Sequence, residues 1–250
     1  LVGVLVTVAI GGGVNYSGER VMIEGQPFTN TLAGYDTQNL GALFDESMLD
    51  PFAVRLDDFD GQYELDMRTG AYAPLDYTAF VSVRTADSDW TDETIKVNWP
   101  LDIGGTRLFL MSNGYAPEIT VRDAEGNIAF TGAAAFPQPD GNLASRGVFK
   151  VPDGLDEQVG FMGFFYPDAA ELTDGTYTSV SPYAGDNSLL SLNMYVGDLG
   201  LNEGVSVNQY TLNIDDLELV AGPRADVKSL KLRIGETVDL PNGLGTLEFT

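Results

Sequence analysis

Apolar and polar residues alternate along most of the chain, which is the pattern of half-buried β-strands. In Tyr77–Arg84, for example, Tyr, Ala and Val occupy every second position, opposite Thr, Phe, Ser and Arg. The same period of two recurs in Thr94–Trp99, Thr106–Ser112, Glu118–Arg122, Ile128–Thr131, Leu190–Val196, Tyr210–Ile214, Leu230–Ile234 and Leu244–Phe249. Two apolar runs, Gly147–Val151 and Val159–Tyr166, are further strand candidates, and the second also suits a buried helical turn.

Turn residues separate these strands. The segments Asp123–Asn127 and Asn242-Gly243 both contain a glycine that can take the positive φ of a tight turn. Roughly a dozen short strands joined in this way predict an all-β, mainly antiparallel fold. We expect a β-sandwich or barrel-like domain with one or two short helices and one or two lobes.

The first stretch, Leu1–Gly13, departs from this pattern. Leu1–Ile10 is apolar apart from Gly3 and Thr7 and carries no charge. It is shorter than the roughly 20 residues of a bilayer-spanning helix, and no basic residue precedes it as in a signal peptide. We therefore interpret residues 1–13 as the end of a transmembrane helix and residues 14–250 as an extracytoplasmic domain, with a buried strand or core helix as the alternative. The predicted membrane-anchoring residues are Leu1, Val2, Val4, Leu5, Val6, Val8 and Ile10.

Three segments interrupt the strands. Within Asn39–Asp50 the apolar residues have helical spacing, which predicts a short surface helix ending before Pro51. Asp168–Gly175 predicts one helical turn. Residues 133–147 are rich in Pro and Gly and lack periodicity, so a long connection is expected there, and near it the boundary of a two-lobed domain.

Composition excludes several functions. The chain has 37 acidic and 13 basic residues and a net charge of -24, whereas a nucleic-acid surface needs clustered Lys and Arg. It contains neither Cys nor His, which removes disulfides, thiol catalysis, the Ser-His-Asp triad and the commonest zinc and haem ligands. No nucleic-acid partner is expected.

The remaining chemical motifs are weak. Asp58 and Asp60 resemble the start of a calcium loop, but the twelfth position is Thr69 where such a loop has an acid. Paired carboxylates for a glycosidase carry no specificity among 37 acids. Alternation predicts Trp99 and Met194 as core residues, rather than as a sugar platform and a haem ligand.

Several segments, in order, resemble the ResB family of cytochrome c biogenesis proteins in its actinobacterial form. They are Glu19–Thr31, Tyr35–Thr37, Leu75–Arg84, Ile95–Asp123 and Leu240–Phe249. The most specific part is the VN-PL…G…NGYAP pattern between Val97 and Pro117. The motif positions singled out by this resemblance, all without an assigned role, are Gly25, Phe28, Asn98, Pro100, Leu101, Asn113, Gly114 and Tyr115.

The resemblance implies the extracytoplasmic domain of a cell-membrane subunit of system II cytochrome c maturation. Such subunits work with a ResC (CcsA-like) partner to deliver haem to the CxxCH motif of apocytochrome c. The family's haem-handling histidines have no counterpart here, since the chain has no His. We therefore expect a non-catalytic domain with no bound cofactor, which docks on the ResC-like subunit and guides apocytochrome c while the wider complex handles haem. A cell-envelope or secreted β-sandwich, binding as an adhesin or to carbohydrate, is the alternative.

Overall fold

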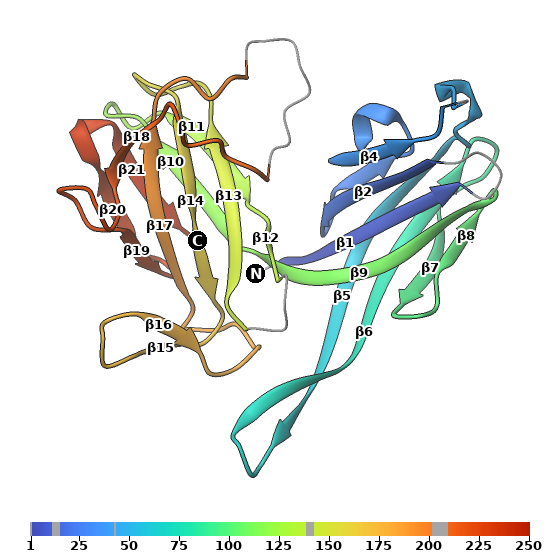
Figure 1. The fold of residues 1–250 in the computed structure, drawn as a ribbon, viewed down its shortest axis with the longest axis horizontal. Helices are drawn as coiled ribbons and strands as arrows, with labels where there is room; N and C mark the ends of the chain where they lie inside the picture. Colours follow the sequence, from blue (N-terminus) through green and yellow to red (C-terminus); the bar gives the residue numbers. More distant parts are fainter. Residues whose placement is uncertain (1, 12–15, 43, 139–142, 202–209) are drawn as a thin grey trace. The chain divides into compact units, whose positions relative to one another are not determined.

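The computed structural model describes residues 2–11, 16–42, 44–138, 143–201 and 210–250 (Figure 1). Strands make up 57% of the chain and helices 4%, which confirms the all-β prediction with mainly antiparallel sheets. Contacts divide the chain into an N-terminal unit, Gly3–Gly114, and a C-terminal unit, Tyr115–Thr250, to which Val2 also belongs. Residues 133–147, where we expected a lobe boundary, lie inside the C-terminal unit.

The N-terminal unit consists of two antiparallel sheets around one core. Its strands are β1 (Val2–Gly11), β2 (Tyr16–Ile23), β3 (Pro27–Thr29), β4 (Thr37–Leu40), β5 (Phe52–Asp66), β6 (Ala71–Thr85), β7 (Thr91–Lys96), β8 (Leu101–Ile103) and β9 (Thr106–Ala116). One sheet has the order β9-β1-β2-β4 with β8 beside β9, and the other has the order β3-β5-β6-β7. Alternate residues of both sheets, such as Met22, Val54, Val81 and Leu108, fill the core between them.

Strand β1 corrects the helix expected at the start of the chain. Val2–Gly11 is a β-strand, paired with β2 from Val4 opposite Ile23 to Gly11 opposite Tyr16. Six of its ten residues are β-branched Val, Ile or Thr, which favour strands over helices. The predicted end of a transmembrane helix is therefore wrong for these residues. Leu1 lies outside the described residues, and contact of Val2, Val4, Leu5, Val6, Val8 and Ile10 with a membrane stays a prediction.

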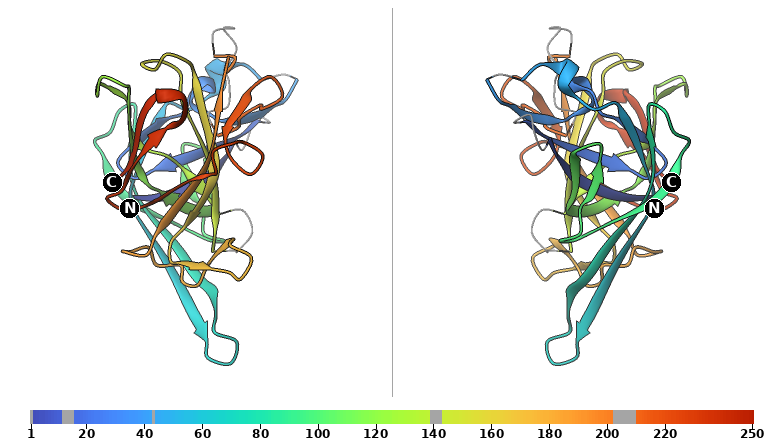
Figure 2. Two further views of the ribbon diagram at one scale, coloured as in Figure 1. Left: turned by 90° about the vertical axis from the view of Figure 1, so that its left-hand side faces the viewer. Right: turned by 90° about the vertical axis from the view of Figure 1, so that its right-hand side faces the viewer.

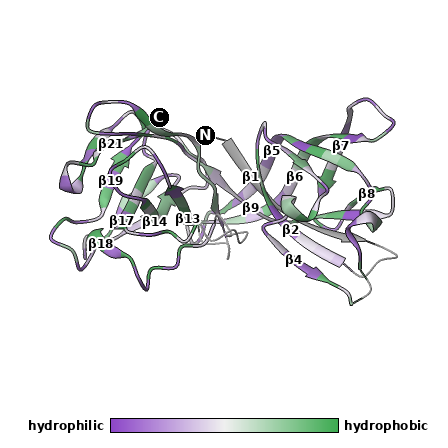
Figure 3. Cartoon of the chain, turned by 90° about the horizontal axis from the view of Figure 1, so that it is seen from above, coloured by the Kyte–Doolittle hydropathy of each residue, from purple (hydrophilic) through white to green (hydrophobic). Residues whose placement is uncertain are grey.

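The C-terminal unit is a second sandwich. Its strands are β10 (Glu118–Arg122), β11 (Ile128–Ala133), β12 (Phe136–Pro137), β13 (Ser145–Val151), β14 (Val159–Tyr166), β15 (Ala169–Glu171), β16 (Tyr177–Ser179), β17 (Leu189–Val196), β18 (Glu218–Ala221), β19 (Leu230–Arg233), β20 (Thr237–Leu240) and β21 (Gly245–Phe249). Sheet β11-β10-β21-β20 faces sheet β13-β14-β17-β18, in which β19 also pairs with β17. The core is aromatic, and Phe149 stacks on Phe161 at 4.6 Å between ring centroids. Figure 3 shows apolar strands and polar turns in this unit.

The helices are shorter than expected. Three 3₁₀ turns occur among the described residues, η1 (Leu32–Gly34), η2 (Glu46–Met48) and η3 (Pro241–Gly243). In the segment Asn39–Asp50, where we expected a helix, the first two residues end β4 and the described helical part is limited to η2; Leu43 lies outside the described residues. Leu40 and Met48 are exposed, whereas Phe44 and Leu49 pack on the core, so the apolar residues of the expected helix do not share one buried face.

The structure tests four further local predictions. Asp168–Gly175 is not helical but forms β15 and a turn, and Tyr210–Ile214 is not a strand. Met194 is fully buried, as predicted, whereas Trp99 is 74% exposed. The reason for the error at Trp99 is that β7 ends at Lys96 and the chain reverses at Asn98, whose φ is 63°.

None of the helices in the described ranges reaches the length and hydropathy required to cross a bilayer.

Candidate functional site

The hairpin of β5 and β6 extends past the other strands of its unit (Figures 1 and 2). We call its outer part, residues 62–76, the arm. Within it, β5 and β6 pair with each other from Gln62 opposite Asp76 to Asp66 opposite Ala71. Their other described partners stop short of it, because β3 pairs with β5 only at Ala53–Arg55 and β7 pairs with β6 only at 78–83. The arm is thus a two-stranded ribbon, a form that is marginally stable alone in water.

The surface of the arm is both apolar and acidic. Met67 at the tip is 87% exposed and Leu75 is 62% exposed, with Leu65 also on the surface. Glu64, Asp66 and Asp76 lie among them. Asp66 pairs with Arg68 within the arm, and Asp76 pairs with Lys96 of β7 at 3.4 Å. Exposed apolar side chains grouped on one element and surrounded by polar residues are typical of protein interaction sites.

The base of the arm is fixed by aromatic and amide contacts. The rings of Tyr63 and Tyr77 meet edge to face at 5.9 Å. The buried side-chain amide of Asn113, on β9, donates a hydrogen bond of 3.0 Å to the Tyr63 hydroxyl. Asn113 therefore ties the root of the arm to the facing sheet, which gives a structural role to one of the family-motif positions.

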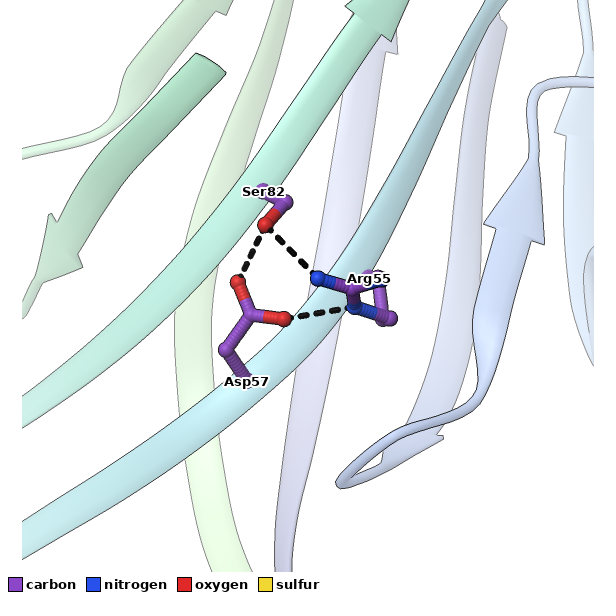
Figure 4. A network of polar contacts seen from close by, with 3 residues as sticks. All are labelled: Arg55, Asp57 and Ser82. Atoms are coloured by element: carbon purple, nitrogen blue, oxygen red, sulfur yellow. Dashed lines mark hydrogen bonds and ion pairs between the residues drawn. The ribbon is translucent and has the colours of Figure 1, made fainter. Parts of the chain in front are cut away.

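A polar network lies further along the same hairpin (Figure 4). The Ser82 hydroxyl donates to the Asp57 carboxylate at 2.5 Å and accepts from the Arg55 guanidinium at 3.1 Å. Arg55 Nε also donates to Asp57 at 2.6 Å. The β-bulge between Leu56 and Asp58 makes this possible, because the extra residue turns Asp57 toward Arg55 and Ser82.

This network is suited to structure rather than to nucleophilic catalysis. Its carboxylate is already paired with Arg55, and the chain has no His to hold the serine proton. Arg55 and Arg84 lie over the Trp90 ring at 5.5 Å and 5.0 Å from its centroid. The cation–π contacts and the hydrogen bonds together order the outer face of sheet β3-β5-β6-β7.

The other family-motif positions are spread over the structure and form no single site. Gly25 has a φ of 80° in the turn before β3, and its N–H donates to the Leu56 carbonyl at 2.8 Å. Phe28 is buried in the N-terminal core. Asn98 takes the left-handed conformation at the β7 turn, Pro100 follows it, and Leu101 begins β8 and packs on the same core.

The NGYAP motif spans the division between the two units. Asn113 and Gly114 are buried residues of the N-terminal unit. Tyr115 begins the C-terminal unit, where its hydroxyl donates to the Pro182 carbonyl at 2.6 Å and its ring packs at 5.1 Å from Phe165. Neighbouring residues of β9 thus place one hydrogen-bonded side chain in each unit: Asn113 in the N-terminal unit and Tyr115 in the C-terminal unit.

The calcium-loop candidate is not a loop. Asp58 and Asp60 lie on β5 and Thr69 lies in the turn of the arm. Among the described residues, no group of three or more His, Cys, Asp or Glu side chains is placed to hold a metal ion.

The arm itself was not predicted from the sequence. A signal for it was present in the apolar residues Leu65, Met67 and Leu75, which interrupt an acid-rich stretch around a glycine turn. What the sequence did not reveal is that β3 and β7 stop short of this part of the hairpin.

The described residues form a protein of two antiparallel β-sandwiches, with an exposed arm that is apolar and acidic and a polar network that stabilises the fold. A family model of the ResB-like family matches residues 1–239, and the chain belongs to that family. The family is associated with cytochrome c biogenesis, as a component and not as a known enzyme. No curated protein and no solved structure matches the chain. The actinobacterial form stays a prediction.

Proposed function

We propose that this chain is a non-catalytic docking domain of cytochrome c biogenesis, on the extracytoplasmic side of the cell membrane. It docks on a ResC (CcsA-like) membrane subunit and guides apocytochrome c, and haem is handled by the wider complex. The observation that carries this proposal is the arm, an element with little packing of its own that exposes Met67 and Leu75.

The arm suits docking for an energetic reason. Burial of an exposed large apolar side chain contributes about 1.5–3 kcal/mol, and the arm carries two that are mostly exposed, Met67 and Leu75, and a third, Leu65, that is 39% exposed. A partner surface would also cover the ribbon, which has no backbone pairing with β3 or β7. Docking therefore stabilises the arm as well as the complex.

The acidic charge supports the second half of the proposal. With a net charge of -24, the chain attracts Lys-rich segments such as those of apocytochrome c. Attraction of this kind is long-range and screened by salt, so it speeds encounter more than it strengthens the final complex.

Co-purification with the ResC-like subunit from membranes tests the docking. We expect Met67→Ser and Leu75→Ser together to reduce recovery of the partner at least about tenfold, which corresponds to about 1.4 kcal/mol. Ile128→Ser is the matched control, since Ile128 is 55% exposed on β11 of the other unit. Equal recovery with the arm variant and the wild type would refute docking through the arm.

Titration with a Lys-rich apocytochrome c peptide tests the guiding role. Its affinity should fall between about 0.01 M and about 1 M salt, over which the screening length falls from about 30 Å to about 3 Å. An affinity independent of salt would contradict the electrostatic part of the proposal.

A further inference from the structure

Four strands in one sheet of the C-terminal unit carry a net charge opposite to that of the whole chain. Strands β13, β14, β17 and β19 contain no acidic residue, although the chain has 37. Their basic residues all lie on the outer face, because the alternate positions fill the core. We call this surface the basic face; its basic residues are Arg146, Lys150, Lys231 and Arg233.

A groove of about 600 Å³ lies on the basic face. Its walls include Met162, Phe164, Tyr166 and Tyr177, and none of its described lining residues is acidic. Neighbouring rings are 6.1–6.2 Å apart, so they form a continuous aromatic surface across β14 and β16. Small-molecule sites in proteins have volumes of about 300–1,000 Å³ and the same mixture of apolar walls and a few polar groups.

Strand register places a cation at each side of this surface. Arg146 lies opposite Phe164, Phe164 opposite Ser191, and Ser191 opposite Lys231, in one line across four strands. Three strand spacings separate the two basic residues, or about 14 Å between their Cα atoms. Both line the groove.

Neither cation is neutralised by a carboxylate within the described part of the chain. Arg146 donates to the Met162 sulfur at 3.0 Å, and the Lys231 ammonium lies 4.5 Å from the centre of the Tyr177 ring. Every described ion pair of the chain involves other residues. No carboxylate of the described residues therefore competes with a ligand for these two positive charges, which lie at either side of an aromatic surface.

We propose that this groove binds a small organic anion with a flat aromatic body, such as an aromatic carboxylate or sulfonate. The aromatic walls stack on the body, and Arg146 and Lys231, one at each side, both attract the acid group, which forms a charge-assisted hydrogen bond with the nearer of the two. The acidic charge of the rest of the chain repels such anions at long range, so binding depends on these two cations. This inference goes beyond the docking function and does not rest on it.

A pair of fluorescent probes tests the site on the whole chain. 8-Anilinonaphthalene-1-sulfonate is an aromatic anion, and N-phenyl-1-naphthylamine is the same ring system without the sulfonate. We expect saturable binding of one sulfonate probe per chain, about tenfold weaker in Lys231→Glu and in Arg146→Glu. Affinity for the uncharged probe should change less than about twofold in these variants, and Phe164→Ala should weaken both probes.

The matched control is Lys228→Glu, which makes the same charge change at an exposed lysine outside the groove. An unfolding midpoint equal to that of the wild type shows that a variant is folded, so that lost binding reports on the groove. Sulfonate affinity that is unchanged in Lys231→Glu and Phe164→Ala, or that falls equally in Lys228→Glu, would overturn the proposal. If the arm variants recover the partner as well as the wild type does, and the sulfonate probe still binds, only the docking function is refuted.

Discussion

Removal of the Ser82 hydroxyl is a direct test of the network in Figure 4. Ser82→Ala deletes one bond to Asp57 and one to Arg55, and hydrogen bonds to charged groups contribute about 1.5–3 kcal/mol each. The Arg55 and Asp57 side chains are 41% and 31% exposed, so water replaces part of what is lost. We therefore expect the free energy of unfolding of the N-terminal unit to fall by about 1–2 kcal/mol in total.

Tryptophan fluorescence during urea unfolding measures this loss. Both tryptophans, Trp90 and Trp99, belong to the N-terminal unit, and Trp90 contacts Arg55 of the network. With a urea dependence of about 2 kcal/mol per M, the midpoint should move down by about 0.5–1 M.

A double-mutant cycle decides whether the loss comes from the network. Ser82→Ala, Asp57→Ala and the double variant should show a coupling of at least about 1 kcal/mol, because the two side chains share a hydrogen bond. Additive effects within about 0.3 kcal/mol would refute the reasoning.

Other predictions concern the C-terminal unit. Phe161→Ala should cost about 3–5 kcal/mol in urea unfolding followed by tyrosine fluorescence, because the ring is fully buried and stacked on Phe149. The hydrogen bonds from Asn127 lower the pKa of Asp123 below its ordinary 3.8. The ionised carboxylate therefore contributes its full stabilisation above pH 3.8 and loses it as the pH falls through the native pKa. Asp123→Asn should remove this contribution, so the wild type and the variant should differ in stability above pH 3.8 and converge below it. Urea midpoints of both proteins at several pH values check this. Haem titrated into the chain should not give the Soret band of His- or Cys-ligated haem, since the chain has neither residue, and burial raises the pKa of Tyr166, which disfavours a phenolate ligand.

Local alternation was enough to predict most strands but not what packs against them. β6, β10 and β21 follow the period-two pattern because one of their faces is buried. The uncharged run of β1 suits a strand and a membrane helix alike, and its β-branched composition favours the strand. At Trp99 the pattern failed because a two-residue turn at Asn98 ended the strand first.

The candidate sites depend on which strands pair across long sequence separations. The period-two pattern of apolar residues carries no information about that pairing. The arm exists because β3 and β7 are short, and the groove exists because β13, β14, β17 and β19 place Arg146 and Lys231 on one line. A resemblance to the family gave the motif positions, and one of them, Asn113, donates a hydrogen bond to the base of the arm.

The composition of β1 has a consequence for synthesis and handling of the protein. Its ten residues carry no charge and no proline, and six are β-branched, which is the composition of segments that assemble into intermolecular cross-β fibrils. In the folded chain its backbone pairs with β2, on which Glu19 and Arg20 lie opposite Val8 and Thr7. Until β2 has been synthesised and has paired with it, β1 is a segment prone to aggregation, and variants that weaken β2 should therefore reduce soluble yield before they reduce binding.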